Sequence, residues 1–137
     1  MRLLLDTNIL LEVLLAQAKA EEAKKFLANP AEHDLFISDF SLHSIGVVLF
    51  RHKLPSAVEQ FVKEMLFDGE ILLLSLEPED MDSVVNSGNR FNLDFDDAYQ
   101  YALAEKYDLT LVSFDADYDR TVRGRKTPAQ ILSSKPA

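Results

Sequence analysis

Four short apolar runs alternate with segments of helical periodicity along this chain of 137 residues. The runs are Arg2–Leu5, Leu35–Ser38, Ile71–Leu74 and Leu109–Ser113. Strands that are separated by helices pair in parallel, because each crossover returns the chain to the same end of the sheet. Runs without polar interruptions are typical of strands buried on both faces. The sequence therefore predicts an α/β fold with a parallel sheet that is covered on both sides.

Capping residues and breakers predict where the helices begin. Thr7 or Asn8 is expected to cap the helix after the first strand, since either side chain accepts from a free amide hydrogen. Asp39 and Ser41 are both suitable caps for the helix after the second strand. A proline suits the first turn of a helix, so a further helix is predicted over Pro55–Phe67. All of these helices alternate with strands, as the predicted fold requires.

The length suits one domain with a substantial core, and no linker-like segment interrupts the chain. We therefore expect one domain over residues 1–132 and a frayed tail over residues 133–137. The acidic and polar residues Asp6, Asn8 and Glu12 interrupt the first apolar stretch, which argues against a signal peptide. With no cysteine and no run long enough to span a membrane, a cytoplasmic protein is expected.

The net charge of −9 limits the kinds of partner that the protein can have. A chain this acidic repels nucleic acid at long range. A role on nucleic acid would therefore need bound cations or a local basic patch.

Acidic residues directly follow three of the four predicted strands. Asp6 follows the first strand, Asp39 the second, and Asp115 and Asp117 the fourth. In parallel sheets, binding sites form beyond the carboxyl ends of the strands. We therefore expect these carboxylates to gather at one edge of the sheet.

A further acid is expected to join them from a late helix. Eight acids lie between Asp94 and Asp119, and only Lys106 balances them there. Most suit helix caps and solvated surface, but Asp97 lies beside the buried positions of its helix. Converging carboxylates need a counter-charge, and hard divalent cations such as Mg²⁺ or Mn²⁺ prefer oxygen ligands. Such a site suits phosphodiester hydrolysis. The alternative is that all these acids are caps and surface charges.

Three stretches resemble the PIN-domain family and, within it, the VapC-like toxin ribonucleases. They are Leu4–Leu10 around Asp6-Thr7-Asn8, the helix start Asp96-Asp97-Ala98, and Leu111–Tyr118 after the fourth strand. The match covers nearly the whole chain in order and spacing. It implies a single-domain three-layer α/β/α sandwich, an endoribonuclease that uses Mg²⁺ or Mn²⁺, an RNA substrate and often a small antitoxin partner.

The resemblance also implies roles for individual residues. It implies that Asp6, Asp97 and Asp115 are catalytic acids that bind the metal. Asp117 would be a fourth acid of the metal site. Asn8 would orient Asp6 or a bound water, and Ser113 would line the site.

Ser44 departs from the family pattern. The family commonly has a glutamate at this place in the helix after the second strand, and a neutral hydroxyl is a poor ligand for a hard cation. Asp39 is a possible substitute. The departure leaves a second interpretation open, in which a catalytically weakened PIN module binds RNA or a protein without cleavage. A haloacid-dehalogenase phosphatase fits poorly, because that family needs an acid where Asn8 stands.

Two further features of the sequence suggest binding partners, but each also has a structural interpretation. Arg120, Arg123 and Arg125 follow the last acids, and they are either RNA-phosphate contacts or a solvated face. The helical segments Ile9–Leu15 and Pro55–Phe67 carry more apolar residues than one buried stripe needs. The surplus suits a homodimer or an antitoxin groove, or it belongs to the core.

Overall fold

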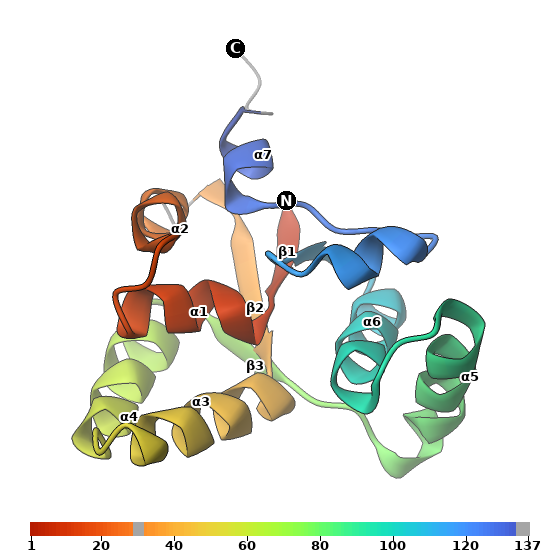
Figure 1. Cartoon of the computed structure of the whole chain (residues 1–137), viewed down its shortest axis with the longest axis horizontal. Coiled ribbons are helices and arrows are strands. Elements are labelled where there is room, and N and C mark those ends of the chain that lie inside the picture. The colour runs from red at the N-terminus through yellow and green to blue at the C-terminus, as the bar shows by residue number, and fades with distance from the viewer. Residues whose placement is uncertain (29–31, 134–137) are drawn as a thin grey trace.

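A four-stranded, all-parallel sheet forms the centre of the computed structural model, which describes residues 1–28 and 32–133 (Figure 1). The strands are β1 Arg2–Leu5, β2 Asp34–Ser38, β3 Leu72–Leu74 and β4 Thr110–Val112, in the order β3-β2-β1-β4. Leu4 of β1 lies opposite Phe36 of β2 and Leu111 of β4. The parallel sheet that the alternating pattern predicts is confirmed.

Helices cover both faces of this sheet, as Figure 1 shows. One side carries α1 Thr7–Leu14, α2 Ala20–Leu27, α3 Asp39–Arg51, α4 Ser56–Phe61 and α7 Pro128–Ser133. The other carries α5 Met81–Phe91 and α6 Phe95–Tyr107. Three further segments are the π-helix η2 Val62–Phe67 and the 3-10 helices η3 Pro78–Asp80 and η4 Ala116–Arg120. The chain is therefore a single-domain three-layer α/β/α sandwich.

The alternation of side chains along β1 divides the core in two. Leu3 and Leu5 pack with the helices on the α1 side, whereas Leu4 packs with the α6 side. All three are fully buried, and each contributes about 1.5–3 kcal/mol of hydrophobic stabilisation. The apolar run that predicted this strand thus supplies both halves of the core.

The third strand is less buried than its sequence predicts. Leu72 and Leu73 keep 58% and 46% of their surface exposed, and the buried residue of this run, Ile71, precedes the strand. The reason is position, because β3 pairs only with β2 and lies at the edge of the sheet. An all-leucine run does not by itself distinguish an edge strand from a central one.

Three helix predictions need correction. The cap of α1 is Asp6, not Thr7 or Asn8, and the cap of α3 is Ser38, not Asp39 or Ser41. In each case the acceptor is the last residue before the helix, so the chain turns directly from strand to helix. The helix predicted over Pro55–Phe67 is instead α4 followed by the π-helix η2.

The predicted domain boundary falls at the end of the described residues. Ser133 is the last residue of α7, and the rest of the expected tail, residues 134–137, lies outside the described part of the chain. Within residues 1–28 and 32–133, no helix is long and apolar enough to cross a membrane.

Candidate metal centre

Asp6 lies at the junction of β1 and α1, and its side chain is only 7% exposed. Four donors surround this carboxylate. Oδ1 accepts from the Thr7 amide at 2.9 Å and from Gln100 Nε2 at 3.1 Å. Oδ2 accepts from Ser113 Oγ at 2.7 Å and from Asn8 Nδ2 at 3.4 Å. Burial raises the pKa of Asp6, and the hydrogen bonds from Ser113, Gln100 and Thr7 oppose this rise.

Gln100 is a site residue that the sequence reasoning did not identify. Its side chain is 1% exposed and spans the gap between Asp6 and Ser41, donating to Ser41 Oγ at 2.8 Å. Ser41 in turn accepts from Thr7 Oγ1 at 2.9 Å. Gln100 Oε1 is buried and has no hydrogen-bond partner among the described residues. The available signal was a polar residue one helical turn after Asp97, on a stretch of α6 that is otherwise apolar and aromatic.

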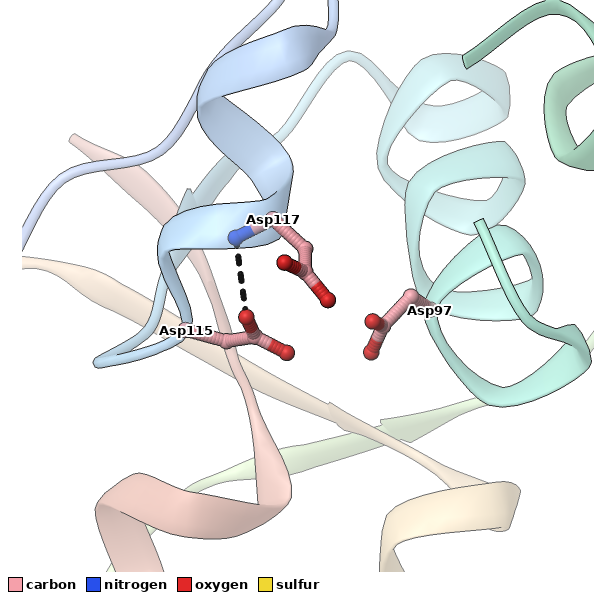
Figure 2. A group of neighbouring side chains, drawn as sticks. All are labelled: Asp97, Asp115 and Asp117. Carbon is pink, nitrogen blue, oxygen red and sulfur yellow. Dashed lines mark hydrogen bonds between the residues drawn. The ribbon is translucent and has the colours of Figure 1, made fainter. Parts of the chain in front are cut away.

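Three other acids point toward one another, as Figure 2 shows. Asp97, Asp115 and Asp117 each offer one carboxylate oxygen, and these oxygens all lie within 4.8 Å of one another. We call these three residues the acid group. Asp97 comes from the first turn of α6, and the other two come from η4 and the residue before it. Asp115 caps η4 by accepting from the Asp117 amide at 2.8 Å, which holds the two together.

Burial and mutual repulsion disfavour the negative charge of the acid group. Burial, and then the charges of Asp115 and Asp94, raise the pKa of Asp97 to about 7. Tyr118, which is fully buried, donates its hydroxyl to Asp97 Oδ1 at 3.1 Å. Burial and the nearby acids raise the pKa of Tyr118, so its hydroxyl stays protonated and remains a donor. A divalent cation would supply the missing counter-charge, and a set of carboxylate oxygens suits Mg²⁺ or Mn²⁺.

Ser113 links Asp6 to the acid group. Its hydroxyl donates to Asp6 Oδ2 and accepts from the Asp115 amide at 2.9 Å. Asn8 donates to Ser113 at 3.2 Å and accepts from the Phe114 amide at 3.2 Å. Asp6 is therefore connected to the acid group through Ser113 and is not one of the three acids whose oxygens lie within 4.8 Å of one another. The sequence-based prediction placed all four acids around the metal.

The two polar residues expected near the missing glutamate lie elsewhere. Asp39 is exposed and accepts from Tyr99 Oη at 2.7 Å and from the Phe40 amide at 2.8 Å. Ser44 is half-buried on α3, and its side chain makes no hydrogen bond with the described residues. Neither side chain belongs to the acid group.

Arg120 pairs with the acid group from one side. It donates to Asp117 at 3.3 Å and to the carbonyl oxygens of Phe91 and Asn92 at 3.2 and 2.7 Å. Because Asn92 lies between α5 and α6, this side chain ties η4 to the segment that leads into Asp97.

The other two arginines are also engaged within the protein. Arg123 donates to Asp108 at 2.9 Å, and Arg125 makes two bonds to Asp119 at 3.2 and 3.1 Å. Arg125 also donates to the Ser113 carbonyl at 3.1 Å. These contacts favour a structural role for both side chains over the predicted role as free RNA contacts.

The fold and the acid group define a single-domain α/β protein with an acidic centre at the carboxyl edge of its sheet. The sequence model of the PIN domain matches residues 3–124, and the chain therefore belongs to the PIN-domain family. No curated protein sequence matches it.

Solved structures with the same fold include three bacterial proteins. VapC20 of Mycobacterium tuberculosis, described as a Sarcin-Ricin loop cleaving toxin, is 17% identical, with a TM-score of 0.71 over 85% of this chain and 92% of that one. FitAcB of Neisseria gonorrhoeae is 20% identical, with a TM-score of 0.69 over 93% and 98%. A toxin–antitoxin complex from Klebsiella pneumoniae is 21% identical, with a TM-score of 0.67 over 91% and 96%.

Proposed function

We propose that the protein is a metal-dependent endoribonuclease of the VapC toxin type. PIN domains are generally nucleases that use a divalent metal, and this chain belongs to that family. The observation that carries the proposal is the acid group, whose three oxygens converge within 4.8 Å and need a cation. One structural neighbour, VapC20, is described as a Sarcin-Ricin loop cleaving toxin, which supports RNA as the substrate class.

In this proposal, Asp97, Asp115 and Asp117 hold the cation directly. A bound Mg²⁺ or Mn²⁺ lowers the pKa of an attacking water and offsets charge on the leaving oxygen. Asp6 is proposed to contribute as the fourth acid, held at one orientation by Asn8 and Ser113. Each oxygen of this carboxylate accepts from two donors, and the longest of these bonds is the one from Asn8 Nδ2 to Oδ2 at 3.4 Å.

A second candidate function rests on Ser44. This half-buried hydroxyl stands where the family commonly has a carboxylate, and it brings no negative charge to the site. A protein that binds RNA and the cation but hydrolyses the phosphodiester slowly, or not at all, is the alternative that Ser44 favours.

A cleavage assay separates these functions. Purified protein is incubated with mixed RNA in Mn²⁺, Mg²⁺ or EDTA, beside the variants Asp97→Asn and Asp115→Asn. Asp96→Asn is the matched control, because Asp96 is an exposed neighbour outside the acid group. We expect cleavage that needs the metal, is lost in the first two variants and persists in the control. Cleavage that survives Asp97→Asn would contradict the nuclease proposal, whereas RNA binding without cleavage would support the weakened module.

We further propose a small antitoxin protein as the partner and the cytoplasm as the place of action. The neighbouring structure from Klebsiella pneumoniae is described as a toxin–antitoxin complex, which supports such a partner. Phe50, Leu54 and Phe67 are large apolar side chains that remain exposed. Co-expression with the product of a small adjacent reading frame, followed by co-purification, tests the pairing. Size-exclusion chromatography of the chain alone tests the predicted homodimer.

A further inference from the structure

Three aromatic rings gather beside the acid group without taking part in it. Tyr99 of α6 is buried, and the rings of Phe40 and Phe95 each lie 6.1 Å from its ring centroid, tilted by 42° and 46°. Phe40 belongs to the first turn of α3, and Phe95 opens α6. Phe95 is 59% exposed, although a phenylalanine ring is costly to leave in water. We call these three residues the aromatic cluster.

Tyr99 fixes the cluster in place. Its hydroxyl donates to Asp39 at 2.7 Å and accepts from the Leu76 amide at 3.0 Å. Burial raises the pKa of Tyr99 to about 12, so the ring stays neutral and keeps both bonds. The exposed Phe95 ring therefore rests on a rigid support, which lowers the entropy that binding a ligand would cost.

The cluster lies along the same edge of the sheet as the acid group. Phe95 precedes Asp97 by two residues in the first turn of α6, so both lie at the start of this helix, although side chains two positions apart project to different faces. Phe40 follows the end of β2, two strand spacings, or about 10 Å, from the end of β4, which leads to Asp115. The starts of α3 and α6 meet at this end of the sheet (Figure 1). A chain bound across this edge would touch both features.

We propose that Phe95, supported by Tyr99 and Phe40, is a stacking site for an unpaired base of single-stranded RNA. The inference rests on the proposed function, because the acid group would hold a phosphodiester of the same strand. Aromatic side chains bind bases of unpaired RNA through their faces, and the faces of paired bases are not available. The site thus selects RNA that is single-stranded next to the scissile bond.

The apolar area of the cluster is that of one flat ring, whereas the charge around it opposes contact with a nucleic-acid backbone. A stable protein interface buries about 800 Å² on each partner, whereas one aromatic side chain provides about 150–250 Å². Asp39, Asp94 and Asp96 are exposed beside the cluster and would repel a phosphate. The contact is therefore with the face of the base, and it should contribute little to the salt dependence of binding.

The test measures binding, so that it does not depend on cleavage. A labelled, single-stranded oligoribonucleotide of mixed sequence, with phosphorothioate linkages that resist hydrolysis, is titrated with the full chain in Mn²⁺. The same titration is made with an oligonucleotide that carries abasic sites. Phe95→Ala is compared with Phe95→Trp and with Phe50→Ala. Phe50 is the matched control, because it is 64% exposed but lies near the far end of α3 from Phe40.

We expect Phe95→Ala to weaken binding of the normal oligonucleotide about tenfold or more, with an unchanged salt slope. Phe95→Trp should retain the affinity, Phe50→Ala should not change it, and the abasic oligonucleotide should bind wild type and Phe95→Ala equally. Three results would overturn the inference. They are unchanged affinity in Phe95→Ala, an equal loss with the abasic oligonucleotide, and failure of the wild-type protein to bind RNA.

Two further measurements keep this inference apart from the proposed function. If Phe95→Ala weakens RNA binding but the protein shows no metal-dependent cleavage, the nuclease proposal is refuted and the stacking site is retained. Cleavage with no effect of Phe95→Ala on RNA affinity would keep the nuclease and refute the site. An oligoarginine peptide that binds wild type but not Phe95→Ala, while RNA binding is unchanged, would assign the ring to a cationic protein partner instead.

Discussion

Burial, and then the negative charges around it, raise the pKa of Asp97 to about 7. Its own hydrogen-bond donor, the Tyr118 hydroxyl, is neutral, and the nearest arginine contact of the acid group, from Arg120, goes to Asp117. Without a cation, the protein therefore partly relieves its own repulsion by binding a proton. Two predictions at the scale of single residues follow from this arrangement.

The first prediction concerns pH in the absence of metal. The pKa of Asp97 is about 7 in the folded protein against an ordinary value of 3.8, so the folded state binds a proton more tightly than the unfolded state. The free energy of unfolding should then fall as the pH rises through about 7, by about 1 kcal/mol after allowance for solvent screening. Urea unfolding in EDTA at about pH 5.5 and pH 8 measures this. Asp97→Asn should remove most of the difference in the free energy of unfolding between the two pH values, and Asp96→Asn should not. A protein that is more stable at pH 8 would contradict a raised pKa of Asp97.

The second prediction concerns Gln100. Gln100→Leu keeps a similar volume but removes a donor from the buried Asp6 carboxylate and from Ser41. A hydrogen bond to a charged group contributes about 1.5–3 kcal/mol, so a loss of stability of about 2 kcal/mol is expected in urea unfolding. Gln60→Leu serves as the control, because Gln60 is exposed on α4 and bonds only to Glu64. Equal effects of the two substitutions would show that the Gln100 bonds add no stability.

At the scale of elements, the edge of the sheet is organised by helix caps. Asp6 follows β1 and caps α1, Ser38 ends β2 and caps α3, and Asp115 caps η4 shortly after β4. At each turn from strand to helix, one polar side chain thus accepts from a backbone amide that would otherwise lack a partner. The same short connections bring the polar side chains of three strands to one place.

Replacing the cap of α3 should destabilise the protein and disturb the site. Ser38→Ala removes the acceptor for the Ser41 amide at 2.9 Å, and Ser38 is fully buried. We expect a loss of about 1–2 kcal/mol in the free energy of unfolding. Ser83→Ala on the surface of α5 is the control and should change stability little, since alanine is the better helix former. If Ser38→Ala is as stable as the control, the cap does not hold α3.

The elements also show how far the sequence could predict this fold. The apolar runs located β1 and β2 within a residue, because an unbroken run of apolar residues is itself the sequence signal of a buried strand. The edge position of β3 was not predictable, since it depends on the order of strands and not on the leucines themselves. The acids at strand ends were visible as motifs. Gln100 was not, because its partner Asp6 lies 94 positions away in the sequence, and the bonds of Arg120 to two backbone carbonyls were not predictable, because no motif records them.

At the scale of the whole molecule, a net charge of −9 makes cations part of the energetics. A divalent ion that binds the folded state alone stabilises it in proportion to the logarithm of its concentration. A concentration of Mn²⁺ ten times the dissociation constant should therefore add about 1.4 kcal/mol. Thermal unfolding in MnCl2, compared with NaCl of equal ionic strength, measures this gain. Asp115→Asn should reduce it, and an equal response to both salts would mean that only general screening acts.

The link from Asp6 to Ser113 also has a consequence for protein synthesis. The two residues are separated by 107 positions, and Asp115 and Asp117 lie later still. A ribosome makes Asp6 well before Ser113, so a growing chain carries no complete site until β4 has joined the sheet beside β1 and the acids after β4 have been made. For a protein proposed to cut RNA, this order delays activity until Asp115 and Asp117 have been translated. Any fragment released before β4 would be harmless to the RNA around it.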